Sequence, residues 1–327
     1  MTLAEQIFRR LGDGRLASGQ ALAAELGVTP SALLQAVQAL EEAGARIETV
    51  SNRGYRLCGG IVALDAARIL AMLPAGAQAR VARCDVAWTL PSTNAALLAA
   101  AEPPCGQAAV MLAEHQTAGR GRRGRQWVAP LGGALCLSIA WSFAGLPRDL
   151  AALSLVAGVC ALRAFAAGDV RGLALKWPND LLAGGRKLGG ILIEMRAESS
   201  GPSLVVIGIG VNVALGADAR ARVAATGNEV ADFVELGGDP DRNVLVARLI
   251  GEIVTALPKF AVEGFAPFAA EWRQADVLRG RAVSVLLGAD TQVGIARGVD
   301  AGGALLVETP TGLKHFVAGE VSVRVQA

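Results

Sequence analysis

The sequence is poor in the residues that build metal cages and disulfide frameworks. Its 327 residues include two histidines and five cysteines, and no two cysteines are spaced as C-x-x-C. A structural zinc site needs several cysteine or histidine ligands at close spacing, and a disulfide framework is typical of short secreted chains with an even set of cysteines. We therefore expect neither of these, and we expect reduced thiols in the cytoplasm.

Long apolar runs and a strong net charge are also missing. LAALSLVAGVCAL at 150–162 is one of the longest apolar runs, and it falls short of the roughly 20 residues that a membrane span needs. The N-terminus lacks the apolar region of a signal peptide. The net charge is +2, so no global field draws the molecule to nucleic acid or to an anionic membrane. We expect a soluble protein without a membrane partner.

The composition is that of a globular protein, on a chain long enough for several domains. Apolar residues make up 53% of the sequence and charged residues 18%, which favours a folded chain over a disordered one. At roughly 150 residues per domain, the length favours two or three domains. The patterns below predict an N-terminal winged helix-turn-helix over 1–60, a central α+β domain with a mixed sheet over 61–278, and a small C-terminal β-barrel over 279–327.

The first sixty residues carry the helix signals of a helix-turn-helix. Ser18 and Thr29 are good N-cap residues at the start of two apolar-periodic segments. Gly27 separates these segments, and Pro30 occupies the first position of the second one. The stretch 45–57 then predicts two strands joined by a tight Asn-Arg-Gly turn, which is the shape of a wing.

DNA binding by this part is one of two readings. Ser31 and Gln35 on the second helix could read base edges, and Arg53 and Arg56 on the wing could contact phosphates. The first sixty residues, however, carry six basic and six acidic side chains, which cancel. The alternative is a winged helix retained as a regulatory or packing module.

The middle and the end of the chain differ in their periodicity. Apolar runs rich in β-branched residues predict strands at 108–116, 134–143, 173–177, 188–196 and 204–213. Helical periodicity predicts helices over 150–166 and 243–261, and we expect the helices to cover one side of the sheet. From Gly280 onwards, short apolar runs alternate with glycine and aspartate turns, which is typical of a small β-barrel.

The stretch GRGRRGRQW at 119–127 has two interpretations. A flexible glycine- and arginine-rich arm could neutralise nucleic-acid phosphates. The stretch is short, however, and lies between two predicted strands, whereas such arms are usually long and repeated. We therefore favour a loop that closes over a small anionic ligand, since the arginine fork binds carboxylate and phosphate oxygens in pairs.

A second motif is KWPNDLLAGGRKLGGILIE at 176–194. Pro178 favours extended geometry before it, so Asn179 and Asp180 follow the end of a strand. Lys187 comes seven residues after Asp180 in a hairpin-like arrangement that could bring the two side chains together. A carboxylate beside an ammonium group, facing an arginine loop, suits phosphoryl or nucleotidyl transfer.

Two weaker motifs complete the pattern. In STN at 92–94, Ser92 or Thr93 is either a helix N-cap or a ligand contact. In IGIGVNV, the glycines allow close approach of a ligand near Asn212. Neither a P-loop nor a Rossmann glycine fingerprint is present in the sequence.

These motifs together resemble the bifunctional biotin protein ligases that double as biotin-operon repressors in bacteria. The likeness covers nearly the whole chain, and GRGRRGRQW and KWPNDLL…RKLGGILIE are its most specific parts. It implies a ligase-like catalytic domain and an SH3-like fold for the C-terminal barrel. It also implies a two-step reaction, in which biotin and MgATP give biotinoyl-5′-AMP and pyrophosphate. A lysine of the biotin carboxyl carrier protein of acetyl-CoA carboxylase then takes the biotinoyl group.

The resemblance also assigns roles to single residues. Arg122, Lys187 and Asp180 are the implied catalytic residues, and Asp180 is the implied Mg²⁺ ligand. The implied biotin and adenylate contacts are Ser92, Thr93, Asn94, Gln116, Arg120, Gly121, Arg122 and Lys187. The implied nucleotide contacts are Arg125, Asn179, Asn212 and Arg324. The implied partners are operator DNA and a second copy of the chain, joined through an exposed sheet edge.

Two other functions fit parts of the sequence. A lipoate–protein ligase would share the catalytic fold, but we find no R-x-x-G-G-G-x-V-x-H stretch. A ligand-sensing repressor without catalysis would not need Asp180, Lys187 and the arginine loop together. One departure from the family is ATGNEVADF at 225–233, the segment that often carries an adenine-covering tryptophan and has none here.

Overall fold

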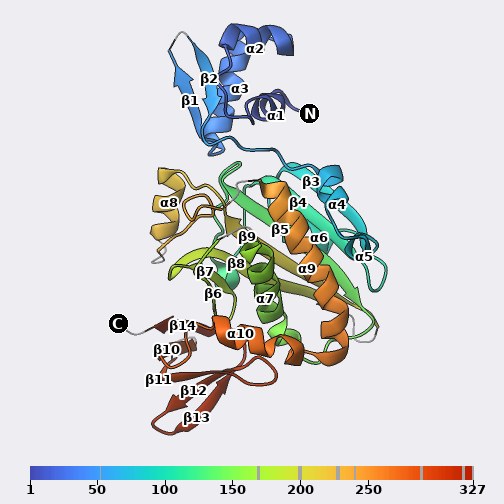
Figure 1. Cartoon of the computed structure of the whole chain (residues 1–327), viewed down its shortest axis with the longest axis vertical. Helices are drawn as coiled ribbons and strands as arrows, with labels where there is room; N and C mark the ends of the chain where they lie inside the picture. The colour runs from blue at the N-terminus through green and yellow to red at the C-terminus, as the bar shows by residue number, and fades with distance from the viewer. Residues whose placement is uncertain are drawn as a thin grey trace.

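The computed structural model describes residues 1–51, 53–167, 170–197, 201–225, 229–238, 241–287, 290–318 and 321–325. An N-terminal helical part, a central sheet with its helices and a small C-terminal sheet follow one another along the longest axis (Figure 1). This order confirms the predicted fold class of a helix-turn-helix, a central domain with a mixed sheet and a small C-terminal β-domain. Among the described residues, no helix is both long enough and apolar enough to cross a membrane.

The N-terminal part has the predicted helix starts. Its elements are α1 (Leu3–Arg10), α2 (Gly19–Leu26), α3 (Pro30–Glu42), β1 (Ile47–Val50) and β2 (Gly54–Leu57). The Ser18 hydroxyl accepts from the amide of Ala21, and the Thr29 hydroxyl accepts from the amide of Ala32. Gly27 adopts a left-handed conformation with φ of 66°, as a glycine at a helix end often does. Asn52, in the predicted wing turn, lies outside the described residues.

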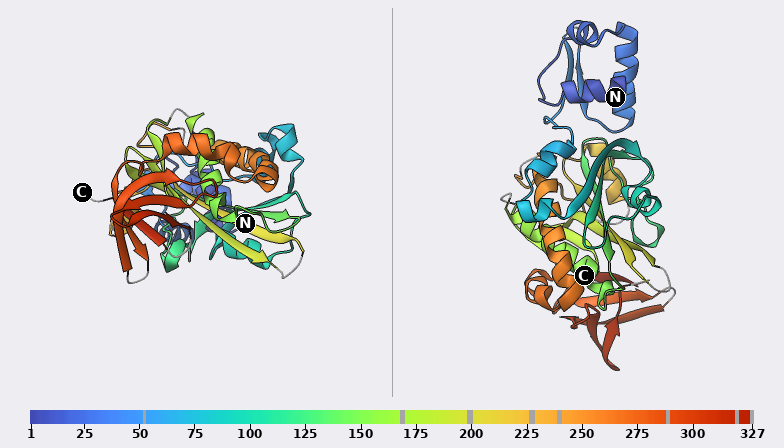
Figure 2. Two further views of the ribbon diagram at one scale, coloured as in Figure 1. Left: turned by 90° about the horizontal axis from the view of Figure 1, so that it is seen from below. Right: turned by 90° about the vertical axis from the view of Figure 1, so that its right-hand side faces the viewer.

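A narrow neck joins this part to the rest of the molecule (Figure 2). The contacts there are specific. Leu131, from the central domain, is 1% exposed and belongs to the hydrophobic core of the winged helix. Its amide donates to the carbonyl of Ala43 at 2.9 Å. The rings of Phe8 and Trp88 meet edge to face with centroids 5.4 Å apart.

The central domain is built on a mixed sheet. In the described part of the chain, seven strands pair in the order β3-β4-β5-β9-β8-β7-β6, and β3 and β4 are parallel. They are β3 (Val81–Leu90), β4 (Ala108–Gln116), β5 (Ala134–Phe143), β6 (Leu173–Lys176), β7 (Asp180–Ala183), β8 (Arg186–Ala197) and β9 (Ser203–Asn212). Two of these strands, β3 and β7, have no counterpart among the strands predicted from the sequence. The helices and short 3-10 turns around the sheet are α4 (Ala66–Ala71), α5 (Ala75–Gln78), α6 (Thr93–Ala99), η1 (Arg122–Gly124), η2 (Leu150–Ala152), α7 (Leu153–Ala166), α8 (Ala217–Ala224), α9 (Arg242–Glu263), η3 (Ala266–Phe268) and α10 (Ala269–Ala275).

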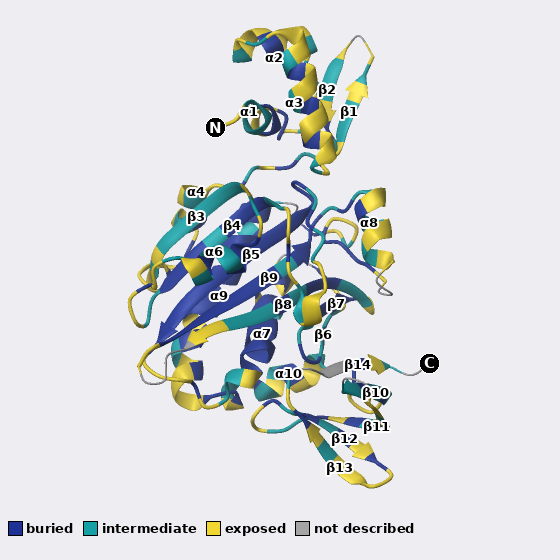
Figure 3. Ribbon diagram, turned by 180° about the vertical axis from the view of Figure 1, so that it is seen from behind, coloured by how far each residue is buried: buried dark blue, intermediate teal, exposed yellow. Residues whose placement is uncertain are grey.

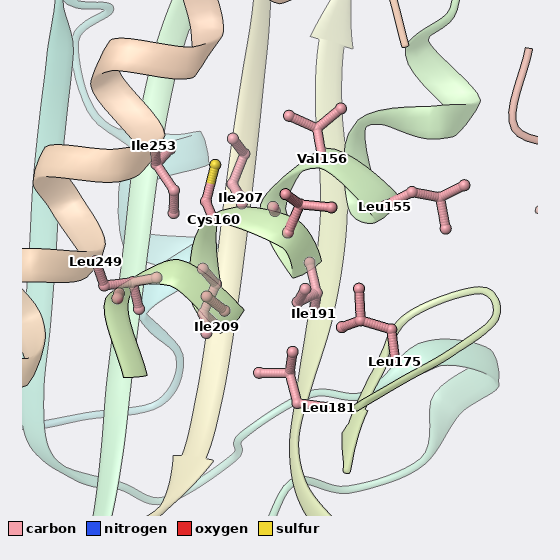
Figure 4. Close-up of a cluster of buried hydrophobic side chains, with 14 of the residues drawn as sticks. Leu155, Val156, Cys160, Leu175, Leu181, Ile191, Ile207, Ile209, Leu249 and Ile253 are labelled. Atoms are coloured by element: carbon pink, nitrogen blue, oxygen red, sulfur yellow. The ribbon is translucent and has the colours of Figure 1, made fainter. Parts of the chain in front are cut away.

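Helices cover both faces of this sheet, so the expectation of helices on one side was wrong. The long helices α7 and α9 pack on one face, against strand residues such as Ile207 and Ile209 (Figure 4). The short helix α6 packs on the other face, where Leu97 contacts a cluster that includes Ala140 and Val206. The sequence gives no periodic signal for this because α6 is short and its alanines are compatible with many environments.

The last strands form a small antiparallel sheet. Its strands are β10 (Ala282–Leu287), β11 (Asp290–Val299), β12 (Leu305–Thr309), β13 (Gly312–Phe316) and β14 (Val321–Val325), in the order β13-β12-β11-β10-β14. Its apolar face continues the core of the central domain, and the indole of Trp177 donates to the carbonyl of Gly303 at 3.1 Å. Burial is deepest in the central sheet and in α7 (Figure 3).

Candidate active site

A cavity of about 600 Å³ opens on the α6 face of the central sheet. This volume lies in the range of pockets that enclose a small organic ligand. Eleven of the predicted site residues line it: Ser92, Thr93, Asn94, Gln116, Arg120, Gly121, Arg122, Arg125, Asn179, Asp180 and Lys187. Among the described lining residues, Asp180 is the only acidic one, whereas five are lysine or arginine. The cavity therefore favours an anionic ligand.

One end of the cavity is a buried polar cluster at the start of α6. Ser92 is the N-cap of that helix, and its hydroxyl accepts from the amide of Ala95. The hydroxyl and the amide of Thr93 both donate to Gln116 Oε1, at 3.1 and 2.7 Å. Ser138 Oγ lies 2.5 Å from Asn94 Oδ1. This end therefore offers ordered hydrogen-bonding groups at a buried position.

Glycines in β9 let these side chains approach the sheet. A Cβ on Gly208 would lie 2.3 Å from Asn94 Oδ1, and a Cβ on Gly210 would lie 2.4 Å from the Trp127 ring. The indole nitrogen of Trp127 is buried and has no hydrogen-bond partner among the described residues. Beneath the ring lie Ala113, Ala134 and Cys136. Burial raises the pKa of the Cys136 thiol to about 12, so this part of the wall is neutral and apolar.

The arginine-rich stretch forms a tight hairpin over the cavity. The amide of Trp127 donates to the carbonyl of Gly119 at 2.9 Å, and the amide of Gly121 donates to the carbonyl of Arg125 at 2.6 Å. Arg123 turns the chain with a φ of 58°, which is uncommon for a residue other than glycine. We call residues 119–127 the arginine hairpin. Its closed hydrogen bonds make it a compact unit rather than an extended arm.

The opposite end of the cavity holds the predicted carboxylate and ammonium pair. Lys187 Nζ donates to Asp180 Oδ1 at 2.6 Å, as the hairpin spacing predicted. Arg122 Nη1 donates to Asn179 Oδ1 at 3.2 Å, and the Asn179 amide donates to the carbonyl of Ile191 at 2.8 Å. Burial lowers the pKa of Arg122 from its ordinary value, although an arginine stays charged. A fixed guanidinium and a fixed ammonium group thus face the same space.

Lys176 is a cation that sequence reasoning did not single out. It is half-buried, and its backbone pairs with Asp180 across β6 and β7. Burial lowers the pKa of Lys176, and the charges of Lys187, Arg125 and Arg324 lower it further, while Asp180 raises it. Its position as the first residue of KWPND, directly before the predicted Asn179 and Asp180, could have identified it as a site residue.

Two predicted nucleotide contacts lie away from the cavity wall. Asn212 is 1% exposed, and its side-chain amide donates to the carbonyls of Lys187 and Ala231 at 3.3 and 3.1 Å. Arg324 lies exposed on β14, where it pairs in register with Ser284. Their nucleotide roles stay predictions. Residues 226–228 of the stretch ATGNEVADF and residues 319 and 320 lie outside the described residues.

The residues predicted to contact DNA lie on the surface of the winged helix. Ser31 and Gln35 are exposed on α3, and Arg53 is exposed next to β2. Arg56 is also exposed, but its Nε donates to Glu48 Oε2 at 3.0 Å. Part of the positive charge expected in the wing is therefore compensated within the wing.

Three family models match separate parts of the chain. The biotin/lipoate A/B protein ligase family matches residues 89–212, which include the cavity residues from Ser92 to Gly210. The biotin protein ligase C terminal domain matches residues 279–324. An HTH domain matches residues 4–56.

Curated proteins and solved structures resemble the chain over most of its length. It is 37% identical over 327 residues to the bifunctional ligase/repressor BirA of Escherichia coli (strain K12), covering 99% of this chain and 98% of that protein. It is 36% identical over 235 residues to the biotin–[acetyl-CoA-carboxylase] ligase of Paracoccus denitrificans, covering 70% of this chain and 96% of that protein. A structure of the biotin protein ligase from Aquifex aeolicus in complex with biotin and ATP matches with a TM-score of 0.61 and 26% identity, covering 75% of this chain and 100% of that chain.

Proposed function

The chain belongs to the family of bifunctional biotin protein ligases and repressors, and from this premise we propose how its own residues carry out the reaction. Biotin and ATP bind in the cavity under the arginine hairpin and form biotinoyl-5′-AMP and pyrophosphate. A lysine of a biotin carboxyl carrier protein then takes the biotinoyl group. The observation that carries this proposal is the placement of Arg122 and the Lys187–Asp180 pair opposite a buried polar cluster in one cavity.

The two ends of the cavity orient biotin. Its ureido ring is neutral and rich in hydrogen-bonding groups, so it suits the cluster at Thr93, Asn94 and Ser138. Its carboxylate then reaches towards the cationic end. There it can meet the phosphates of ATP beside Arg122 and Lys187.

In the first step, a carboxylate oxygen of biotin attacks the α-phosphorus of ATP, and pyrophosphate leaves. Two anions must approach each other, and the cations of the arginine hairpin and Lys187 offset their repulsion. Because Asp180 holds the ammonium group at 2.6 Å, Lys187 is oriented before the ligand arrives. Preorganised charge of this kind acts on the transition state without reorganising first.

The described cavity wall offers Mg²⁺ one carboxylate ligand, that of Asp180. No group of three or more metal-ligating side chains occurs among the described residues, which argues against an all-protein metal cage. Mg²⁺ usually binds through one or two carboxylates together with substrate phosphates. Asp180 is the carboxylate on the described wall that could hold it beside ATP. When bound, the ion would supply further positive charge to the phosphates.

In the second step, the amine of the carrier lysine attacks the biotinoyl carbonyl carbon, and the bond to the AMP oxygen breaks. The amine loses a proton, and AMP leaves with the bonding electron pair. We propose Asp180 as the residue that orients this amine or accepts its proton, since it is the carboxylate beside the reacting end of the cavity. The arginine hairpin shields the mixed anhydride from water until then.

Mass measurement of the carrier tests the enzyme proposal. The protein is incubated with biotin, MgATP and the biotin carboxyl carrier domain of its host, and the carrier is weighed. We expect a mass increase of one biotinoyl group, none with lipoate in place of biotin, and none without ATP. An unchanged carrier mass with a folded protein would contradict catalysis and leave the ligand-sensing repressor.

The winged helix adds a second function to this proposal. We propose that it binds operator DNA through Ser31, Gln35 and Arg53, with Arg56 contributing less because Glu48 already pairs with it. We also propose a homodimer formed through the edge strand β3, which among the described strands pairs with β4 alone. Free cysteines and the ATP requirement fit a cytoplasmic protein. A gel shift on the host's biotin-gene promoter, with and without biotin and ATP, tests the repressor half, and no shift in either state would contradict it.

A further inference from the structure

Glu194 is the last residue of the motif at 176–194, where the sequence assigned it no role, and it contacts two residues that line the cavity. On β8, alternate residues point to the same face, so Glu194 follows Gly190 and Leu192 on the side of the cavity. Its side chain is 25% exposed. It contacts two site residues at once, one on each of its carboxylate oxygens.

One oxygen fixes the orientation of Asn94. Asn94 Nδ2 donates to Glu194 Oε2 at 2.8 Å. An ionised carboxylate can only accept hydrogen bonds, so the amide must turn its NH₂ group towards β8. Asn94 Oδ1 is then left as the acceptor for Ser138 Oγ at 2.5 Å. Asn94 Nδ2 also donates to the carbonyl of Leu192 at 3.3 Å, so the shorter contact to Glu194 reinforces an orientation that the β8 backbone also favours.

The order of donors and acceptors continues from Asn94 through the polar cluster. Ser138 carries one hydroxyl proton, and it lies within hydrogen-bond distance of two acceptors, Asn94 Oδ1 at 2.5 Å and Thr93 Oγ1 at 2.7 Å, so the Asn94 orientation decides which of them receives the proton. At the other end of this series of hydrogen bonds, the Thr93 hydroxyl donates to Gln116 Oε1 at 3.1 Å. Loss of the negative charge of Glu194 would therefore alter which hydrogen-bond donors and acceptors this end of the cavity offers to a ligand.

The second oxygen holds the arginine hairpin. Arg120 Nη1 donates to Glu194 Oε1 at 3.1 Å. Because the hairpin is closed by its own backbone hydrogen bonds, a restraint on Arg120 restrains the whole unit. The Arg120 side chain is 50% exposed, and ion pairs this open to water are weak and screened by salt. Such a contact holds the hairpin over the cavity yet lets a ligand displace it.

From these contacts we propose that Glu194 is a positioning residue for the ligase reaction. Through Oε2 it sets the amide orientation of Asn94 at the polar end of the cavity, and through Oε1 it holds the arginine hairpin over that cavity. Glu194 thus connects the part of the site that receives the biotin ring with the part that receives the phosphates. This role rests on the function proposed above.

A neighbouring ion pair provides a matched control. Arg196 lies two residues further along β8 and pairs with Glu102 at 2.8 Å, next to the end of α6. Both ion pairs join a glutamate to an arginine beside β8, and the two arginine side chains have similar exposed fractions. The partners of Arg196, Glu102 and the carbonyl of Leu98, do not line the cavity, whereas the partners of Glu194, Asn94 and Arg120, do. Glu102→Gln should therefore change only local surface charge.

The test compares Glu194→Ala, Glu194→Gln and Glu102→Gln in the full chain, in two measurements. Calorimetric titration gives the affinity for biotin alone and for ATP alone. Limited trypsin cleavage without ligand, mapped by mass spectrometry, gives the opening of residues 119–127 at low and high KCl. We expect Glu194→Ala to weaken biotin binding roughly tenfold and ATP binding less than twofold. Cleavage in the hairpin should become roughly threefold faster.

The isosteric variant separates the two contacts. Glu194→Gln keeps the side-chain shape but removes the charge and adds a donor, so hairpin cleavage should match that of Glu194→Ala. KCl should accelerate hairpin cleavage in the wild type and in Glu102→Gln, and it should have little effect in either Glu194 variant. The thermal midpoint of Glu194→Gln should stay close to that of the wild type.

The outcomes that overturn the inference are distinct from failure of the proposed function. Equal biotin affinity in the wild type and Glu194→Ala, or hairpin cleavage equal in all four proteins, would overturn the role of Glu194. A wild-type protein that binds no biotin would overturn the proposed function instead. The cleavage measurement needs no ligand, so in that case it would still decide whether Glu194 holds the hairpin.

Discussion

The two faces of the central sheet are made of different residues although the same strands supply both. Towards α7 and α9, β9 presents large side chains such as Ile207 and Ile209 (Figure 4). Leu135 and Ile139 of β5 belong to the same buried cluster. Towards the cavity, the alternate positions of these strands carry Cys136 and Ser138 on β5 and Gly208 and Gly210 on β9. Strand alternation places consecutive residues on opposite faces. One face is therefore free to stabilise the domain, while the other leaves room for a ligand.

Packing density explains why this division is useful. A filled apolar face contributes stability in proportion to the area that it buries. A cavity face gives up that contribution, because its glycines leave space for Asn94 and Trp127 to lie against the sheet. Substitutions on the two faces should thus affect different quantities, stability on one and ligand binding on the other.

The largest expected effect concerns the cationic end of the cavity. Lys187→Ala should slow biotinoyl-AMP formation by roughly a hundredfold to a thousandfold, because a preorganised cation is lost. Pyrophosphate release with biotin and ATP measures this rate. Arg186→Ala is the control, since Arg186 pairs with Glu235 at 2.6 Å. Equal rates in the two variants would mean that Lys187 has no special role.

A neighbouring pair on β9 compares the two faces directly. Gly208→Ala should weaken biotin binding at least roughly tenfold, because the new Cβ would displace Asn94. Ile207→Ala should instead lower the free energy of unfolding by roughly 2–5 kcal/mol, with unchanged biotin affinity in the folded protein. Urea denaturation and calorimetric titration of both variants separate the effects. An Ile207→Ala variant with weaker biotin binding and an unchanged free energy of unfolding would contradict this division between the two faces.

Two cysteines make a chemical version of the same comparison. Burial raises the pKa of Cys136 and of Cys160 to about 12, so both should alkylate far more slowly than exposed Cys105 at pH 8. Cys136 lines the cavity, whereas Cys160 lies on α7 and faces α9 (Figure 4). Biotin should therefore protect Cys136 further, while Cys160 should react only on unfolding. Mass mapping of labelled peptides measures the alkylation rates of both cysteines. Equal protection of Cys136 and Cys160 by biotin would contradict the placement of only Cys136 in the ligand cavity.

The smallest expected effect is the pH dependence contributed by His115, at the end of β4. Burial lowers the pKa of His115 below its ordinary value of 6.5, so folding favours the neutral ring. As the pH falls through that value, the unfolded state takes up the proton first and stability decreases. His115→Asn should reduce the loss of stability between pH 7.5 and pH 5.5, measured by urea midpoints. An identical loss in both proteins would rule out His115 as its source.

The sequence predicted local features of the fold well and distant ones less well. The helix starts at Ser18 and Thr29 follow from side chains that cap their own helix, and β4 and β5 have the predicted bounds. The edge strand β3 was missed because VARCDVAWTL mixes charged and apolar residues, and most of them are only partly buried. Its pairing with β4 depends on the tertiary fold rather than on a local pattern.

The candidate site divides in the same way. Asp180 and Lys187 were expected to meet because one short hairpin joins them, and they do. Ser138 and Glu194 were not foreseen, since their contacts with Asn94 span 44 and 100 residues of sequence. Those contacts follow from the strand order β5-β9-β8, which no motif encodes.

A crystal structure with bound biotinoyl-5′-AMP is the most direct test of the central claim that the glycine-lined face holds the reaction. We predict the biotin ring against Thr93, Asn94 and Ser138, the phosphate in contact with Arg122 and Lys187, and the arginine hairpin closed over both. A conjugate bound elsewhere, with the arginine hairpin making no contact to it, would contradict this assignment.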